Sequence, residues 1–188
     1  MVAKEAVMGE AMAMWRTEHE RFAQLLDFLE RQMEAFHAGR QPHYALMREV
    51  VHYLHHYGDV SHHPREDVAF ARLVVRSPGL GMVISRLLQE HRVIAVAGDA
   101  LLGYLDDILN DVIIERDAVE AVAATYLVYY RHHLASEERE IFPRAAQLLT
   151  AADWAEVADA VATIPDPLFG KQVDARYRAL REEIAQVA

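Results

Sequence analysis

A histidine and a carboxylate stand four residues apart in the stretch His62-His63-Pro64-Arg65-Glu66-Asp67. This spacing places His62 and Glu66 on one face of a helix, one turn apart, so both side chains can reach the same metal ion. A near copy follows later in the chain, His132-His133-Leu134-Ala135-Ser136-Glu137-Glu138. The two stretches indicate metal binding by imidazole and carboxylate groups, a ligand set that suits iron, manganese or zinc.

The composition narrows both the fold and the chemistry. The chain has 188 residues, 53% of them hydrophobic, with few glycines and prolines, which favours a single helical domain. Its net charge of −10 argues against nucleic acid or an anionic membrane as a partner. It contains no cysteine, which excludes disulfides, iron–sulfur clusters and thiol catalysis, whereas it contains 11 histidines.

Apolar residues recur every three or four positions over four long segments, and this period predicts helices. Turn signals separate the segments at Gly39–Pro42, Ser77-Pro78 and Asn110-Asp111. Short connections between long helices predict an all-α fold, an antiparallel up-down four-helix bundle over residues 1–149. Residues 150–188 are expected to form a C-terminal helical extension packed on the bundle. The expected helices span residues 4–37, 42–76, 77–109, 112–149, 150–163 and 169–187.

The second helix is expected to be irregular before its metal-binding stretch. Gly58 and Pro64 both disturb a helix, and an internal proline costs about 3 kcal/mol. The apolar stripe upstream extrapolates to Ser61, one residue short of His62. The sequence therefore predicts a kink, a break or a π-type bulge between Gly58 and Pro64.

Four histidines, one on each long helix, are expected to share one layer of the bundle. In an antiparallel hairpin, two residues at equal distances from the turn lie side by side. The midpoints between successive histidines fall in the first turn and directly beside the other two, so each histidine faces the next. A carboxylate one helical turn further on joins the layer from the second helix and from the fourth. The predicted metal ligands are His19, His62, Glu66, His91, His133 and Glu137.

A layer of this kind needs a partner for every polar atom. A buried imidazole requires hydrogen bonds, and a buried carboxylate must be paired or neutralised. One metal ion, or two ions bridged by the carboxylates, satisfies all of these groups. Tyr57, Tyr126 and Tyr130 are available to orient ligands.

These motifs resemble a known family. The stretch His-His-Pro-Arg-Glu-Asp, the later His-x-x-x-Glu before Ile141-Phe142-Pro143, and the Glu-His pairs at 18–19 and 90–91 look like the hemerythrin-like HHE cation-binding domain. The resemblance covers about residues 12 to 148, and Asp166-Pro167-Leu168-Phe169-Gly170 is similar to a tail of some bacterial members. It implies two iron ions bridged by the two carboxylates and an oxo or hydroxo group, with the family's ligand roles on the six residues named above. Zinc or manganese is an alternative.

The chain departs from the oxygen-carrying members at Ala95, where they place a second histidine on the third helix. His63 or His132 is a candidate replacement for that imidazole. In the fourth helix, Glu137 matches the four-residue spacing and Glu138 matches the five-residue spacing of some relatives; we favour Glu137. His52, His55, His56 and His63 are expected to be partly exposed.

The leading functional hypothesis is a protein that binds or senses dioxygen, nitric oxide or peroxide at a buried di-iron site. An enzyme that turns over peroxide or oxidises iron is one alternative, and a structural zinc or mixed-metal bundle is another. We see neither a signal peptide nor an apolar run long enough to cross a membrane, so the expected compartment is the cytoplasm. The apolar side of the last helix is a candidate homodimer contact.

Overall fold

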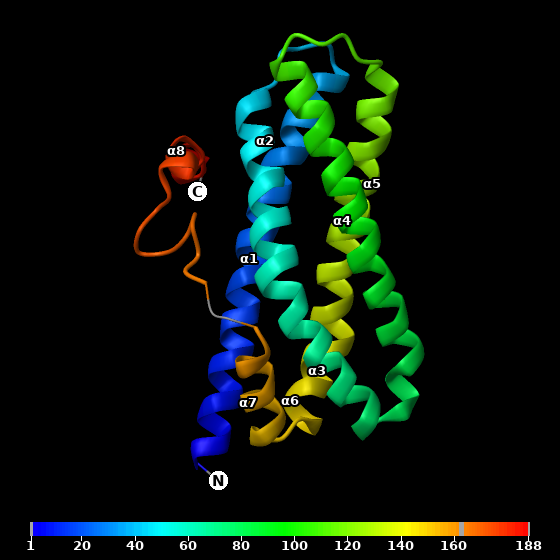
Figure 1. Ribbon diagram of the computed structural model, residues 1–188, viewed down its shortest axis with the longest axis vertical. Helices are drawn as coiled ribbons and strands as arrows, with labels where there is room; N and C mark the ends of the chain where they lie inside the picture. Colours follow the sequence, from blue (N-terminus) through cyan, green and yellow to red (C-terminus); the bar gives the residue numbers. More distant parts are fainter. Residues whose placement is uncertain (1, 162–163, 188) are drawn as a thin grey trace.

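The computed structural model describes residues 2–161 and 164–187, and the described residues are all helix, turn or loop. The prediction of an all-helical fold is confirmed. Four long helical segments lie side by side and are joined by short connections (Figure 1). Two of the segments are single helices, α1 (Val2–His37) and α4 (Gly81–Leu109). The other two are composite: α2 (Tyr44–Tyr53), η1 (Leu54–His62) and α3 (His63–Arg76) form one, and α5 (Arg116–Ser136), η3 (Glu137–Ile141) and α6 (Phe142–Leu148) form the other.

The predicted turns separate these segments. Gly39 has a φ of 70° and Asp111 a φ of 59°, left-handed conformations that end helices. Pro78 opens a short 3-10 helix, η2 (Pro78–Leu80), ahead of α4. The Ser77 side chain makes no capping hydrogen bond there, so of the predicted cap and first-turn pair only the proline is found.

The predicted irregularity in the second segment is a π-helix, η1. The His63 amide donates to the Gly58 carbonyl, five residues earlier, where an α-helix would use the carbonyl four residues earlier. The extra residue in the turn corrects the one-residue mismatch between the apolar stripe and His62. A second π-helix, η3, lies just before Pro143, a residue that is expected to bend or end the fourth helix locally.

Buried apolar side chains of the helices form two clusters, and a layer of polar side chains lies between these clusters. One contains Trp15, Phe70 and Phe142. The other contains Phe22 and Tyr130. On each long segment the predicted histidine lies between residues of the two clusters, so the histidine layer is closed above and below by hydrophobic core.

The C-terminal part differs from the prediction. The helix α7 (Ala151–Ala160) begins with the predicted capping box, in which Thr150 and Asp153 bond each other's backbone amides. It packs on α1 and α3. Thr163, its expected end, lies outside the described residues.

The predicted last helix over residues 169–187 is wrong in its first half. The Asp166 carboxylate accepts hydrogen bonds from the amides of Leu168 and Phe169, and the Asp174 amide donates to the Pro167 carbonyl, so residues 167–174 close into a loop. Helix begins only at η4 (Ala175–Tyr177) and continues as α8 (Arg178–Val187), which contacts α2. In the part of the chain that the structure describes, every helix is too short or too polar to cross a membrane.

Candidate metal centre

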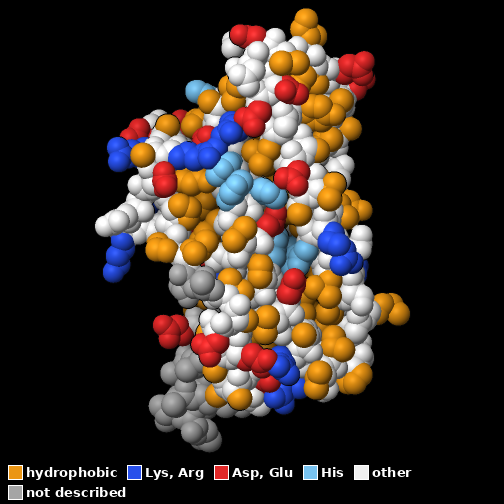
Figure 2. All heavy atoms as spheres, viewed as in Figure 1, with side chains coloured by type: hydrophobic (Ala, Val, Ile, Leu, Met, Phe, Trp, Pro, Cys, Tyr) orange, Lys and Arg blue, Asp and Glu red, His pale blue; other side chains and the backbone are white. Residues whose placement is uncertain are grey.

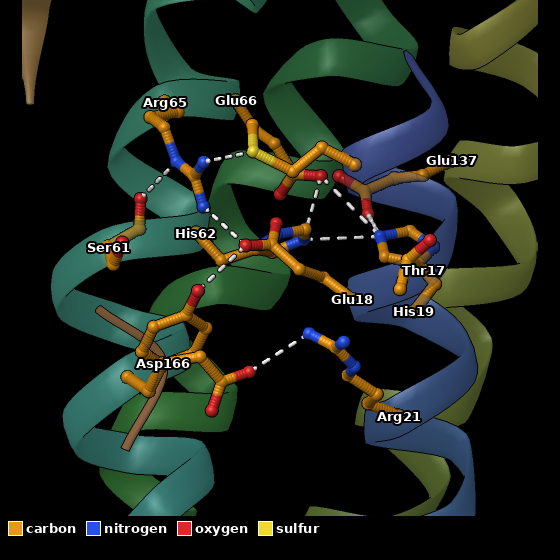
Figure 3. A network of polar contacts seen from close by, with 12 residues as sticks. Thr17, Glu18, His19, Arg21, Ser61, His62, Arg65, Glu66, Glu137 and Asp166 are labelled. Carbon is orange, nitrogen blue, oxygen red and sulfur yellow. Dashed lines mark hydrogen bonds and ion pairs between the residues drawn. The ribbon is translucent and has the colours of Figure 1, made fainter. Parts of the chain in front are cut away.

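The four predicted histidines lie in one layer, as the midpoint argument required. The Nε2 atoms of His19 and His62 are 3.2 Å apart, and those of His91 and His133 are 3.0 Å apart. Glu66 joins the two pairs, because its Oε1 lies 3.0 Å from His62 Nε2 and its Oε2 lies 3.7 Å from His91 Nε2. Figure 3 shows His19, His62, Glu66 and Glu137 converging from three helical segments.

The ligand atoms form two groups of four, each with all four atoms within 4.8 Å of one another. We call them the two-histidine group and the three-histidine group. Glu66 belongs to both. The two-histidine group consists of His19, His62, Glu66 and Glu137, and the three-histidine group consists of His63, Glu66, His91 and His133.

His63 is the unexpected member of this centre. It was expected to be partly exposed, but it is only 4% exposed, so that expectation is wrong. Consecutive helical residues point about 100° apart, and the adjacent histidines accordingly serve different neighbours. His62 faces His19 of α1, whereas the ring of His63 stacks on that of His91 in α4 at 4.2 Å. His63 thus brings a third imidazole to the group in which α4 carries Ala95.

The structure also shows where the other candidate ligands lie, His132 and the neighbours Glu137 and Glu138. The side chain of His132 is 52% exposed, and its Nδ1 lies 3.1 Å from Glu90, outside the layer. Glu137 is fully buried, and its Oε2 lies 3.4 Å from His19 Nε2 and 3.2 Å from His133 Nε2. The side chain of Glu138 is 52% exposed and reaches only the outer nitrogen of His19.

Every histidine of the two groups has its outer nitrogen beside a carboxylate. The Nδ1 atoms donate to these carboxylates or lie within ion-pair distance, which fixes the ring orientation and leaves Nε2 free to face the centre. Sequence reasoning did not assign these outer partners, although four of them stand directly beside a predicted ligand in the chain. The pairs are His19–Glu138 (3.2 Å), His62–Glu18 (2.7 Å), His63–Asp59 (2.9 Å), His91–Asp67 (2.9 Å) and His133–Glu90 (3.3 Å).

The centre is strongly polarised. Burial raises the pKa of Glu18, but the hydrogen bond from His62 and the charges of His62 and Arg65 outweigh it, and the pKa falls to about 2. Burial lowers the pKa of His62, but Glu66 and Glu18 outweigh burial and raise it to about 9. Burial and the charge of Glu66 hold the pKa of Glu137 well above its usual range. The anionic form of Glu137 is therefore disfavoured beside the negative charge of Glu66, and a bound cation would relieve this repulsion.

Several buried atoms of the centre lack hydrogen-bond partners and are suited to bind cations. The four carboxylate oxygens of Glu66 and Glu137 and the Nε2 of His63 make no hydrogen bond of acceptable geometry. An unsatisfied buried acceptor costs roughly 1–3 kcal/mol, and more when it is charged. Two nitrogens bound at right angles to one ion, each about 2.1 Å from it, would be about 3 Å apart. The separations of 3.2 and 3.0 Å between paired Nε2 atoms match this value.

The predicted tyrosines take different positions. The Tyr57 hydroxyl donates to Glu18, which in turn accepts from His62, so Tyr57 acts on the centre through one carboxylate. The hydroxyls of Tyr126 and Tyr130 are buried without a hydrogen bond. Figure 2 also shows histidine side chains at the surface, at mid-height of the molecule. His56 is exposed, and its ring stacks on that of the half-buried His52.

Comparison with known proteins agrees with this geometry. The family model described as the hemerythrin HHE cation binding domain matches residues 10–145, which include both ligand groups. Searches of curated proteins and of solved structures gave no match. The family match covers more than half of the chain, and the chain therefore belongs to the hemerythrin family, whose HHE domain binds cations.

Proposed function

We propose that residues 10–145 form the antiparallel four-helix bundle of this family and hold two iron ions, one at each ligand group. The observation that carries this proposal is the position of Glu66, which turns one oxygen to the two-histidine group and the other to the three-histidine group. A carboxylate in that position bridges two cations. Imidazole and carboxylate ligands without any thiolate suit iron, with zinc or manganese as the alternatives.

The side chains have separate roles in this proposal. Glu66 and Glu137 balance the charge of the cations, and the histidines supply neutral nitrogen ligands. The outer carboxylates hold each imidazole in the tautomer that leaves Nε2 unprotonated toward the centre. Iron, when bound, supplies a redox-active Lewis acid in a site whose surroundings are apolar on both sides.

We propose further that the chain binds or senses dioxygen, nitric oxide or peroxide at this centre. Burial supports a small ligand: the six ligands of the sequence prediction and His63 are all at most 8% exposed. A site this enclosed limits loss of the ions and excludes large substrates. The rival function is an enzyme that consumes peroxide or oxidises iron. Because His63 takes the place of the imidazole that is absent at Ala95, the number of protein ligands does not favour this rival.

The test is metal analysis followed by ligand exposure. Protein expressed anaerobically with iron is expected to contain two irons per chain and to give a stable absorption change with dioxygen or nitric oxide that reverses under vacuum. Consumption of peroxide over many turnovers would favour the enzyme. Stoichiometric zinc without iron would contradict the proposal. Glu66→Gln should lose both irons, and the control Glu20→Gln, at an exposed position of α1, should keep them.

A further inference from the structure

A pocket of about 180 Å³ opens beside the three-histidine group, between α3 and α4. We infer that this pocket is the route by which an uncharged small molecule of the dioxygen, nitric oxide or peroxide class reaches the centre; the inference rests on the proposed function. The pocket is lined by Asp59, His63, Pro64, Asp67, His91, Arg92 and Ala95.

The pocket leads to only one of the two ligand groups. His63 and His91, which belong to the three-histidine group, are part of its lining, whereas the lining includes neither His19 nor His62. Exposure agrees with this asymmetry. His91 is 8% exposed, whereas His19 is 1% exposed and His62 is 0% exposed. The three-histidine group is therefore the side of the centre that solvent approaches.

Ala95 is the residue that keeps this pocket open. It stands four residues after His91, on the same face of α4. A larger side chain at this position would project into the space beside the His63 and His91 rings. Ala95 stands where the oxygen-carrying members have a histidine, and its small side chain also leaves the pocket open. His63 supplies an imidazole from the opposite wall.

The size and charge of the pocket define what can enter. A volume of about 180 Å³ is ample for a molecule of two to four atoms. Asp59 and Asp67 lie on its wall, each beside a histidine nitrogen, and Arg92 supplies one positive charge. An anion would face two carboxylates against one guanidinium. A molecule of a few atoms without charge meets no such opposition.

The absence of cysteine from the chain allows the pocket to be closed after folding and iron loading. Ala95→Cys would be loaded with iron, treated with a benzyl methanethiosulfonate reagent, and mixed with nitric oxide in a stopped-flow instrument. The control is Ala100→Cys, an exposed position on the same helix. Modification at position 95 should slow nitric oxide binding at least tenfold without loss of iron, and removal of the benzyl group by a thiol should restore the rate. Modification at position 100 should leave the rate within twofold.

Two results would overturn the inference. The first is an unchanged binding rate in Ala95→Cys after its full modification, verified by mass spectrometry, with iron retained. The second is a thiol at position 95 that the reagent cannot reach in the folded protein before iron is added, when no metal can protect the thiolate, because the pocket would then be closed. Ala95→Leu, which needs no reagent, provides an independent check and should also slow binding. If the unmodified, iron-loaded protein binds no nitric oxide at all, the proposed function fails, and this result is distinct from a route that lies elsewhere.

Discussion

The two ligand groups are built on one plan but differ in access. In each, a glutamate on one long helix accepts a hydrogen bond from the histidine of the next segment: Glu18 from His62, and Glu90 from His133. The residue that follows Glu66 and the residue that follows Glu137 also match. Each contacts a histidine on a long segment of the other half of the chain. Asp67 bonds His91, and Glu138 bonds His19. The paired histidine stretches thus reflect a two-fold repeat that extends to the outer carboxylates.

The repeat is broken at the residue that follows His62 and at the matching residue that follows His133. His63 follows His62, whereas Leu134 follows His133. As a result, the three-histidine group has one more imidazole, and it is also the group beside the pocket. The two-histidine group has two carboxylates, its four side chains are at most 1% exposed, and none of His19, His62, Glu66 and Glu137 lines the pocket beside His91. We expect the enclosed group to retain its ion more firmly and the three-histidine group to meet the ligand, and the following changes test this division.

The largest effect is expected from Glu66→Ala, because this residue contributes to both groups. Both ions should be lost, and the melting temperature should fall relative to the loaded wild type, since bound metal stabilises the folded state by mass action. Metal analysis and calorimetry measure these effects. Full metal retention in Glu66→Ala would rule out the bridging role.

His63→Leu should separate the two groups, because it gives the first stretch the residue that the second carries at Leu134. One ion per chain should remain, held by His19, His62, Glu66 and Glu137. His62→Ala should instead remove the enclosed ion and lower thermal stability. If His63→Leu retains two ions with unchanged affinity, His63 is a packing residue and not a ligand.

The outer carboxylates should have smaller effects. Glu18→Gln and Glu90→Gln should each weaken metal binding by roughly 10- to 100-fold, the usual result of losing a partner of a ligating histidine. The loss should be larger for Glu18, because its hydrogen bond to His62 is 2.7 Å against 3.3 Å for Glu90 and His133, and because Arg65 also pairs with it. Metal titration against a competing chelator measures both affinities. Equal losses would contradict the ranking by distance.

The smallest effect concerns the pH dependence of the metal-free protein. Glu18 has a pKa near 2 in the folded state against 4.5 in the unfolded chain, so its contribution is present above pH 4.5 and is lost as the pH falls toward 2. His62 has a folded pKa near 9, so its contribution is present below pH 6.5 and is lost as the pH rises through 9. Glu18→Gln should flatten the acid limb of a denaturation series. An unchanged acid limb would show that this pair does not govern it.

Much of this arrangement could be predicted from sequence because helical geometry is regular. The layer of four histidines followed from turn positions alone. A one-residue mismatch and Pro64 predicted an irregularity after Gly58, with a π-type bulge as one of three forms; the π-helix found there begins earlier, at Leu54. The burial of His63 could not be predicted in this way. The residue that follows an inward-facing histidine is buried only when another helix packs on that side of its own helix. The last helix was misjudged because residues 167–174 form a loop closed by a hydrogen bond from the Asp174 amide to the Pro167 carbonyl, a contact that helical periodicity does not reveal.

The most direct test of the central claim is X-ray diffraction from iron-loaded crystals, with anomalous scattering measured at the iron edge. The account predicts two iron peaks on either side of Glu66, one between His19 and His62 and the other among His63, His91 and His133. A single peak, or a second peak that His63 does not contact, would contradict it.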